Sequence, residues 1–271
     1  MKWTVLTENT VNKRGLLSEH GLSVLVEVNG KRILFDTGQT DVFLQNASQL
    51  NVSLDELDAV VLSHGHYDHC GGLQFLKDQE IPVVYMGKGA AFKKLSREND
   101  GGFREIGIPW STDFIRAVNV KETDGLHEIF PDVFLLSGIP KLADFEGVSP
   151  VFYQMKDELA SADLMQDEQL LIMRENGKIH VLAGCCHMGF ISCLRYIRKY
   201  FPKEDFGTVL AGMHLRNVTC ERLNATIEAV KELNPECLIP VHCTGTIAIA
   251  QMKLTLGDKC RLAEAGSRIL I

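Results

Sequence analysis

The 271-residue sequence contains no long apolar run and no excess of positive charge. No segment approaches the roughly 18 apolar residues of a membrane span, and the opening MKWTVLTENT lacks the apolar core of a secretory signal. Acidic residues outnumber basic ones, and the net charge of −7 argues against a surface that binds nucleic acid. The sequence therefore predicts a soluble, cytoplasmic protein without a membrane or nucleic-acid partner.

Internal repeats and low-complexity segments are also missing from the sequence. With 45% apolar residues the chain can bury a large core, and we expect one domain over residues 1–271. In a reducing cytosol most of the eight cysteines are expected to be small buried side chains rather than disulfide partners.

Two β-hairpins are predicted from Asn-Gly pairs between apolar runs. Asn29-Gly30-Lys31 separates strands over 23–28 and 32–36, and Asn176-Gly177 separates the strands LLIMRE and KIHVLAG. Further strands are expected over 82–86 and 133–137. A helix is expected over 41–50, with Asp41 as its N-cap.

The segment Gly87–Pro131 is rich in charge and glycine and is predicted to be irregular, as is a second stretch from Lys141 to Asp167. Long irregular segments inside compact domains often cover a substrate. A solvated insertion without a role is the alternative interpretation of residues 87–131.

Five predicted strands end in polar residues, at Asp36, His64, His187, His214 and His242. The last four lead toward predicted helices, over 71–77, 189–200, 220–233 and 245–256. Ligands of open α/β sheets collect beyond the carboxyl ends of the strands. We therefore expect these polar side chains to converge.

Histidine is scarce, with nine residues in the chain, yet three of them lie in the six-residue stretch HGHYDH. His64 and His66 alternate, so an extended backbone points both to one side, whereas Asp68 and His69 follow on a turn. The pattern suits two metal ions, one beside each pair. Imidazole nitrogens with a carboxylate favour zinc, and also iron or manganese. Each ion needs further ligands, for which His187 and His242 are candidates together with the four residues above.

The stretch SHGHYDHCGG resembles the His-x-His-x-Asp-His signature of the metallo-β-lactamase superfamily, and LFDTG at residues 34–38 resembles the strand-end aspartate of that family. EHGLSVLVE, DEQLL, GCCHMG, MHL and PVHCTG resemble the markers of one branch, which includes metal-dependent hydrolases and a dihydropterin synthase. This resemblance covers nearly the whole chain. It implies an α/β chain folded as a four-layer αββα metallo-β-lactamase sandwich.

The resemblance also implies two divalent metal ions, with zinc as the first choice. His64, His66 and His187 are implied as ligands of one ion, and Asp68, His69 and His242 as ligands of the other. Many family members bridge their metals with an aspartate after a glycine, whereas this sequence has Cys185 after Gly184. Cys185 is either a thiolate ligand or a buried cysteine near the metal. Its neighbour Cys186 is expected to be a packing residue.

Five further residues have two interpretations each. Asp36 is expected to hold a ligand imidazole in one tautomer rather than to bind metal directly. His214 is a ligand, proton donor or substrate contact, or else a core histidine. His20 either reaches the site from the N-terminal loop or has a surface role. Asp167 and Glu168 are either site residues or a solvated pair of charges.

Four residues have weaker support as site residues. His127 and His180 lack a supporting sequence context and are expected to be structural. The pair Thr244-Gly245 opens a predicted helix, where backbone N–H groups could bind a phosphate or where the pair could simply cap the helix.

Two metal ions that activate a bridging hydroxide would hydrolyse a small anionic substrate, with Asp68 and His214 as catalytic residues. The same ligands would serve the synthase, which joins a dihydropterin-methyl diphosphate to a ribofuranosyl-aminobenzene phosphate in methanopterin-type coenzyme biosynthesis. A di-iron redox protein would need a flavodoxin-like extension, for which 271 residues leave no room. A non-catalytic metal-binding protein is disfavoured because all six ligand types are present. The sequence does not determine the oligomeric state.

Overall fold

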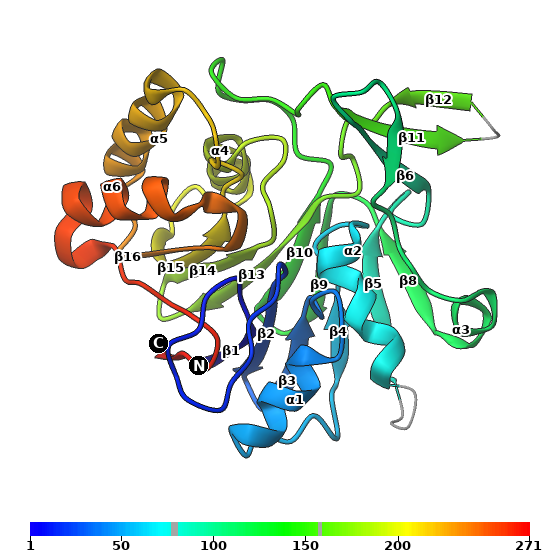
Figure 1. Cartoon of the computed structure of the whole chain (residues 1–271). Helices are drawn as coiled ribbons and strands as arrows, with labels where there is room; N and C mark the ends of the chain where they lie inside the picture. The colour runs from blue at the N-terminus through cyan, green and yellow to red at the C-terminus, as the bar shows by residue number, and fades with distance from the viewer. Residues whose placement is uncertain (77–80, 157–158) are drawn as a thin grey trace. The chain divides into compact units, whose positions relative to one another are not determined.

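The computed structural model describes residues 1–76, 81–156 and 159–271, and they form two compact units (Figure 1). Unit 1 comprises residues 1–123, 149–167 and 264–271, and unit 2 comprises residues 124–148 and 168–263. Each unit combines β-sheet with helices. The predicted mixed α/β class is therefore confirmed, whereas the assignment of the chain to one domain stays a prediction.

The main sheet of unit 1 has seven strands in the order β17-β1-β2-β3-β4-β5-β8. Its strands are β1 (Lys2–Thr7), β2 (Ser23–Val28), β3 (Lys31–Phe35), β4 (Ala59–Val61), β5 (Val84–Gly87), β8 (Val120–Thr123) and β17 (Arg268–Leu270). Strands β3, β4, β5 and β8 run parallel, so the carboxyl ends of these strands lie at one edge.

A smaller antiparallel sheet and short helices complete unit 1. The sheet has the order β12-β11-β6-β7, formed by β6 (Lys93–Arg97), β7 (Phe103–Glu105), β11 (Phe152–Lys156) and β12 (Leu159–Ala162). The helices are α1 (Val42–Gln49), α2 (Tyr67–Cys70), the 3₁₀ helix η1 (Gly71–Leu76) and α3 (Thr112–Ala117). Helix α1 buries Phe43 and Ala47 against the apolar side chains of the main sheet.

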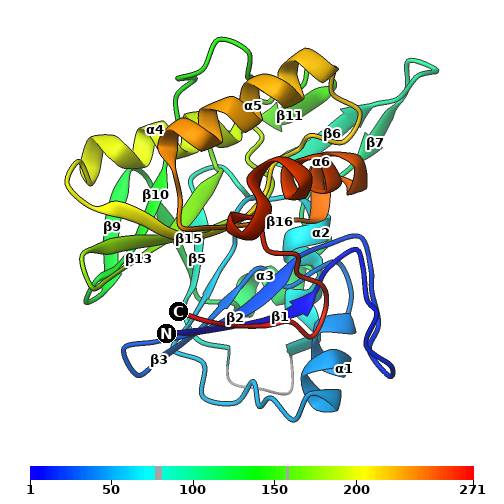
Figure 2. The same ribbon diagram turned by 90° about the vertical axis from the view of Figure 1, so that its left-hand side faces the viewer.

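Unit 2 is built on a six-stranded sheet with the order β16-β15-β14-β13-β10-β9. Its strands are β9 (Leu126–Phe130), β10 (Val133–Ser137), β13 (Gln169–Glu175), β14 (Lys178–Ala183), β15 (Asp205–Gly212) and β16 (Cys237–Val241). Its helices are α4 (Phe190–Tyr200), α5 (Cys220–Leu233) and α6 (Thr246–Leu256), with 3₁₀ turns η2 (His242–Thr244) and η3 (Gly257–Lys259). Helices α4 and α5 pack on one face of this sheet, which Figure 2 shows from the side.

Both predicted hairpins are confirmed. Val28 pairs with Lys31, and Glu175 pairs with Lys178, so each turn contains two residues. The φ angles are +50° at Asn29, +73° at Gly30, +52° at Asn176 and +74° at Gly177. Such turns need left-handed backbone at both positions, and Asn-Gly tolerates it.

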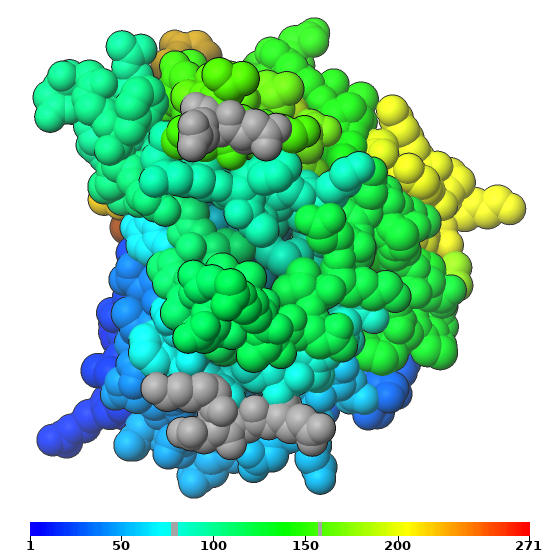
Figure 3. Space-filling view, turned by 90° about the vertical axis from the view of Figure 1, so that its right-hand side faces the viewer, coloured from blue at the N-terminus to red at the C-terminus, as the bar shows by residue number. Residues whose placement is uncertain are grey.

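The prediction of irregular structure over 87–131 was wrong, because that segment contains β6, β7, α3, β8 and β9. None of the α3 side chains is buried, and Figure 3 shows this helix on the surface. The stretch Lys141–Asp167 likewise contains β11 and β12, although residues 157 and 158 lie outside the described part. Exposed, charged strands lack the apolar pattern from which strands are predicted.

Two helix predictions need correction. The helix expected over 71–77 is the 3₁₀ helix η1 to Leu76, preceded by the single turn α2, and Lys77 lies outside the described residues. Asp41 occupies the N-cap position of α1, but its side chain makes no capping bond and instead accepts a bond from Gln45 Nε2 at 3.1 Å. In the part of the chain that the structure describes, no helix has the length and hydropathy to cross a bilayer.

Candidate metal centre

The main group of predicted ligands in unit 1 follows strand β4. This strand has three buried apolar residues, after which the chain leaves the sheet. His64 and His66 lie in the loop, and Asp68 and His69 lie on α2, which begins directly after His66. All four side chains are buried. Burying four polar side chains costs free energy unless hydrogen bonds or a cation compensate.

The atoms of these four side chains that could bind a metal point toward one another. His64 Nε2 lies 3.0 Å from His66 Nδ1, and His69 Nε2 lies 3.8 Å from Asp68 Oδ2. The ring centroids of His64 and His69 are 4.3 Å apart. Three imidazoles and one carboxylate thus converge in a buried place. This donor set fits a divalent cation such as zinc, iron or manganese.

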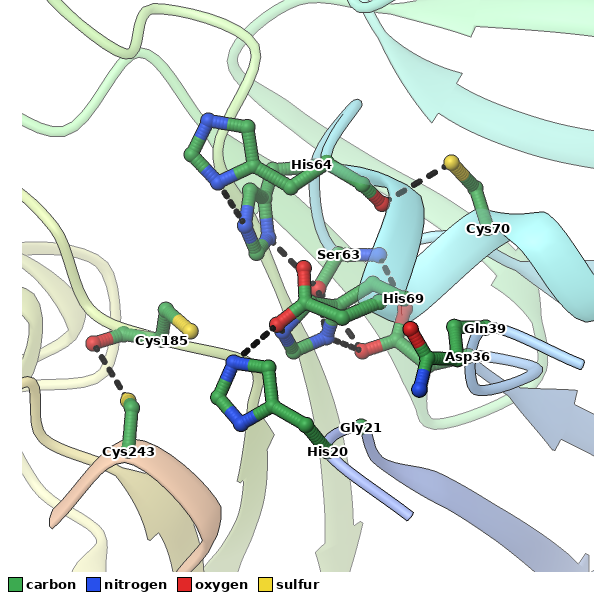
Figure 4. A network of polar contacts seen from close by, with 12 residues as sticks. His20, Gly21, Asp36, Gln39, Ser63, His64, His69, Cys70, Cys185 and Cys243 are labelled. Atoms are coloured by element: carbon green, nitrogen blue, oxygen red, sulfur yellow. Dashed lines mark hydrogen bonds and ion pairs between the residues drawn. The ribbon is translucent and has the colours of Figure 1, made fainter. Parts of the chain in front are cut away.

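Asp36 holds this group from the end of β3. Its carboxylate accepts bonds from Ser63 N at 2.6 Å and from Ser63 Oγ at 2.7 Å, and its Oδ2 lies 2.6 Å from His69 Nδ1 (Figure 4). The φ of Asp36 is +54°, an unfavourable left-handed conformation for a non-glycine residue. With Nδ1 bound to Asp36, His69 presents Nε2 for a metal.

His20 approaches the same group from the N-terminal loop. Its Nε2 lies 3.2 Å from Asp68 Oδ2, and its Nδ1 lies 3.3 Å from the Asn9 amide. The His20 side chain is 46% exposed, so within unit 1 it lies between the buried predicted ligands and solvent.

A buried ion-pair network that the sequence did not reveal lies beside the HGH loop. Lys94 Nζ donates to Asp163 Oδ2 at 2.7 Å and to Asp167 Oδ1 at 2.8 Å, and all three residues are buried. Burial works to lower the pKa of Lys94, but the charges and hydrogen bonds of Asp167 and Asp163 raise it above its usual value. The other oxygen of Asp167 accepts a bond from Gly65 N at 2.8 Å.

The predicted ligands of unit 2 follow three neighbouring parallel strands, β14, β15 and β16. Their carboxyl ends share one edge of the sheet. Left-handed backbone occurs after each of them, with φ of +50° at Cys186, +47° at His214 and +53° at His242. Strained non-glycine residues cluster at functional sites because packing must hold them there.

The edge of this sheet brings Cys185, His214 and Cys243 together, with one ligand atom of each within 4.8 Å of the others. His214 N donates to Cys243 Sγ at 3.2 Å, and that thiol lies 3.7 Å from the Cys185 carbonyl oxygen (Figure 4). Sequence analysis missed Cys243. Its only signal was its position directly after the predicted ligand His242.

Cys243 and His214 favour the charged state of one another. Burial opposes ionisation of the thiol, but hydrogen bonds with Cys185 and His214 and the nearby charge of His242 hold the pKa of Cys243 well below its usual value. Burial lowers the pKa of His214, yet its hydrogen bond to Cys243 raises it overall. A thiolate is a soft donor that suits zinc, and His214 would join it as a ligand only with a neutral imidazole.

His187 is placed by its neighbours in unit 2. Its ring centroid lies 4.6 Å from that of His214. The buried carboxylate of Glu168 accepts bonds from His187 N at 2.7 Å and from Met188 N at 3.2 Å. Neither Asp167 nor Glu168 is therefore a solvated charge.

The remaining candidates have contacts of a structural kind. His180 is buried and accepts a bond from Thr208 N at 3.0 Å, whereas His127 is exposed beside Asp124. Thr244 Oγ1 donates to the Ala211 carbonyl at 3.3 Å, and Gly245 is the N-cap of α6 without a side-chain capping bond. Cys186 packs in the core of unit 2.

Within unit 1 the structure thus brings together six predicted site residues, His20, Asp36, His64, His66, Asp68 and His69. In unit 2, Cys185, His187, His214 and His242 lie in the segments that follow the three parallel strands. The assignment of His64, His66 and His187 to one ion, and of Asp68, His69 and His242 to another, draws on both units and stays a prediction.

Comparison with known proteins establishes the family. A model of the metallo-beta-lactamase superfamily matches residues 19–168, which include the whole HGHYDH stretch. The chain belongs to the metallo-β-lactamase superfamily. A solved structure described as Tm1679, a metal-dependent hydrolase of the beta-lactamase superfamily, is 32% identical and superimposes with a TM-score of 0.89, covering 100% of this chain and 99% of that one. The predicted fold class is confirmed by this similarity.

Two curated relatives come from Methanocaldococcus jannaschii. The uncharacterized protein MJ0448 is 30% identical over 250 residues, covering 92% of both chains. A 7,8-dihydropterin-6-methyl-4-(beta-D-ribofuranosyl)-aminobenzene-5'-phosphate synthase is 32% identical over 257 residues, covering 84% of this chain and 82% of the synthase. These two similarities confirm the resemblance in sequence to the branch that includes the dihydropterin synthase.

Proposed function

We propose that this protein is a metal-dependent hydrolase that acts on a small anionic substrate through two divalent ions, with zinc as the first choice. The observation that carries the proposal is the buried convergence of His64, His66, Asp68 and His69 in unit 1. Three imidazoles and a carboxylate are too costly to bury together for packing alone. The similarity to a metal-dependent hydrolase supports the same conclusion.

The proposed ligands are the six residues of the family pattern: His64, His66, Asp68, His69, His187 and His242. Cys185 is a seventh candidate, as a thiolate in place of the aspartate that many relatives have. The thiol of Cys185 lies within 4.8 Å of ligand atoms of His214 and Cys243, which supports a soft donor at this position.

Bound divalent ions supply positive charge that stabilises an anionic transition state and lowers the pKa of a water toward ~7. The protein's own residues prepare this chemistry. Asp36 fixes the tautomer of His69, and Asp68 holds its carboxylate between His69 and His20. The hydrogen bond with Cys243 raises the pKa of His214 despite its burial, which favours the protonated imidazole that a proton donor to a leaving group needs.

Metal content and turnover test the proposal together. Purified parent protein is expected to hold two ions per chain by elemental analysis and to hydrolyse phosphodiester or lactone probes. His66→Ala should lose metal and turnover. His127 is an exposed histidine outside the ligand groups, so His127→Ala should retain both. A parent that binds no metal after reconstitution would favour a non-catalytic protein and would refute the hydrolase.

A transferase is the second candidate, because the dihydropterin synthase covers most of this chain. The proposed ligands would be the same, with the ions neutralising a diphosphate leaving group. Diphosphate release only when both the dihydropterin-methyl diphosphate and the ribofuranosyl-aminobenzene phosphate are present would support it. Turnover of the phosphodiester or lactone probes without an arylamine would favour the hydrolase.

The proposal places the protein in the cytoplasm. None of the eight cysteines, all within the described residues, forms a disulfide. Free thiols are the state expected in a reducing compartment.

A further inference from the structure

Two neighbouring carboxylates bind the backbone of two loops that carry predicted ligands. In unit 1, Asp167 Oδ2 accepts the N–H of Gly65, the residue between His64 and His66, at 2.8 Å. In unit 2, Glu168 accepts the N–H of His187 at 2.7 Å. Each bond lies inside one unit, while the two residues that make them are consecutive in the chain.

Asp167 is itself held firmly. Lys94 Nζ donates to Asp167 Oδ1 at 2.8 Å and also to Asp163. One oxygen of the Asp167 carboxylate therefore accepts from the Lys94 ammonium, and the other accepts from the Gly65 N–H. A Cβ added to Gly87, at the end of β5, would lie 2.0 Å from the Asp167 carbonyl oxygen. The backbone of Asp167 is therefore packed against the sheet, which leaves its side chain little freedom.

The Gly65 loop is equally confined. A Cβ at Gly65 would lie 2.1 Å from the Ala90 carbonyl oxygen, so only glycine fits there. The loop can then adopt few positions, and the bond to Asp167 selects one. A charge-assisted bond from a backbone N–H to a buried carboxylate is stronger than a neutral one.

Glu168 binds its loop through both oxygens. Its Oε1 accepts from His187 N, and its Oε2 accepts from Met188 N at 3.2 Å. The residue is 1% exposed, so this carboxylate lacks the solvent that a surface charge would have. Two bonds to successive peptide groups fix the direction in which the His187 side chain leaves the backbone.

We propose that Asp167 and Glu168 are positioning residues, which fix the peptide groups of the HGH loop and of the His187 loop so that their imidazoles are oriented for metal. The inference rests on the proposed function, because it takes His64, His66 and His187 as ligands. Outer partners that orient metal ligands typically change metal affinity by about 10–100-fold when removed. Lys94 acts one step further out, by holding the Asp167 carboxylate in place.

The test uses Co²⁺ as the probe, with affinity measured by competition against a chelator and site geometry followed by the Co²⁺ absorption spectrum. Asp167→Ala and Glu168→Ala should each weaken Co²⁺ binding by about 10–100-fold and alter the spectrum. Glu168→Gln keeps an acceptor for His187 N and should recover most of the affinity. Asp167→Asn keeps an acceptor for Gly65 N and should recover part of it, because the pair with Lys94 is lost.

Glu146→Ala is the matched control. Glu146 is also a buried carboxylate of unit 2 that accepts two successive peptide N–H groups, from Ile191 at 2.9 Å and Ser192 at 2.8 Å, but it binds helix α4 rather than a ligand loop. Thermal unfolding of the metal-free proteins should show that Glu146→Ala and Glu168→Ala are destabilised to a similar extent. Only Glu168→Ala should lose Co²⁺ affinity.

Two results would overturn the inference while leaving the proposed function intact. Parental Co²⁺ affinity and spectrum in both Asp167→Ala and Glu168→Ala would show that the loops need no such support. Equal loss of affinity in Glu146→Ala would show that the effect follows general destabilisation. A parent that binds no Co²⁺ would refute the proposed function, and the inference with it, which is a distinct outcome.

Discussion

The contact between Asp36 and His69 shows how one side chain prepares another. Asp36→Ala removes the acceptor that lies 2.6 Å from His69 Nδ1, so His69 would lose its fixed tautomer and orientation. We expect a loss of metal affinity of about 10–100-fold. Chelator competition with the purified variant measures it. Asp58→Ala is the control, since this carboxylate of unit 1 binds Lys31 and Arg32 away from the ligands, and its metal affinity should equal that of the parent.

His180 gives a prediction about pH that does not involve the metal. Burial lowers the pKa of His180 below its usual value of 6.5, and its Nδ1 accepts a bond from Thr208 N. As the pH falls below about 6.5, the unfolded chain takes up a proton that the folded chain resists, so the stability due to neutral His180 is present above this pH and is lost below it.

Urea unfolding of metal-free protein at about pH 7.5 and about pH 5.5 checks this prediction. The difference in unfolding free energy between the two conditions should be smaller in His180→Gln than in the parent. The glutamine oxygen can replace the acceptor for Thr208 N, but this side chain does not titrate. An unchanged difference would show that His180 takes up its proton equally in both states.

Sequence patterns predicted the ligand types at the residue scale, but not the contacts around them. HGHYDH carries its own signal, because scarce histidines recur at metal-binding spacing. Lys94 has no such signal, since it lies in the charged run KKLSR, and its two partners are 69 and 73 positions away. Only folding shows that this lysine is buried with two carboxylates.

At the scale of elements, the glycines of the two hairpin turns give a prediction about stability. Gly30 and Gly177 have φ of +73° and +74°, and a Cβ at either position would meet nothing within 4 Å. Gly30→Ala and Gly177→Ala should therefore each cost about 1–2 kcal/mol through backbone conformation alone. Denaturant unfolding measures this cost.

Gly102→Ala is the control for these turns. Gly102 lacks a left-handed φ, and the nearest atom to an added Cβ is the terminal Oδ1 of the exposed Asp100 side chain at 3.1 Å. Its unfolding free energy should stay within about 0.5 kcal/mol of the parent. Equal effects at all three glycines would contradict the conformational explanation.

Elements that are apolar or end in Asn-Gly were predictable, whereas exposed ones were not. The strand over 133–137 and the helix over 220–233 have the predicted bounds, because the strand is a continuous buried run and the helix buries residues at helical spacing. Strand β7 has three exposed residues, and β6 pairs with β11 across 56–62 positions. Long-range pairing of polar strands leaves no local pattern in the sequence.

Metal removal is the test for the whole molecule. A ligand that binds only the folded chain stabilises it by about 4 kcal/mol at a free concentration of 1,000 Kd. For a chain of this size that corresponds to a rise in Tm of roughly 10 °C. Zinc should therefore raise the Tm of chelator-treated parent protein, and it should raise that of His66→Ala much less. Identical shifts in Tm of the parent and of His66→Ala would indicate that zinc binds elsewhere.

The seven-stranded sheet of unit 1 also has a consequence for synthesis on the ribosome. Its edge strand β17, Arg268–Leu270, pairs with β1, Lys2–Thr7, which emerges from the ribosome earlier than β17. At about 5–20 residues per second, β1 exposes an unpaired edge for roughly 10–50 s before its partner is made. During that interval the nascent chain would depend on chaperones, and slowing translation should increase aggregation.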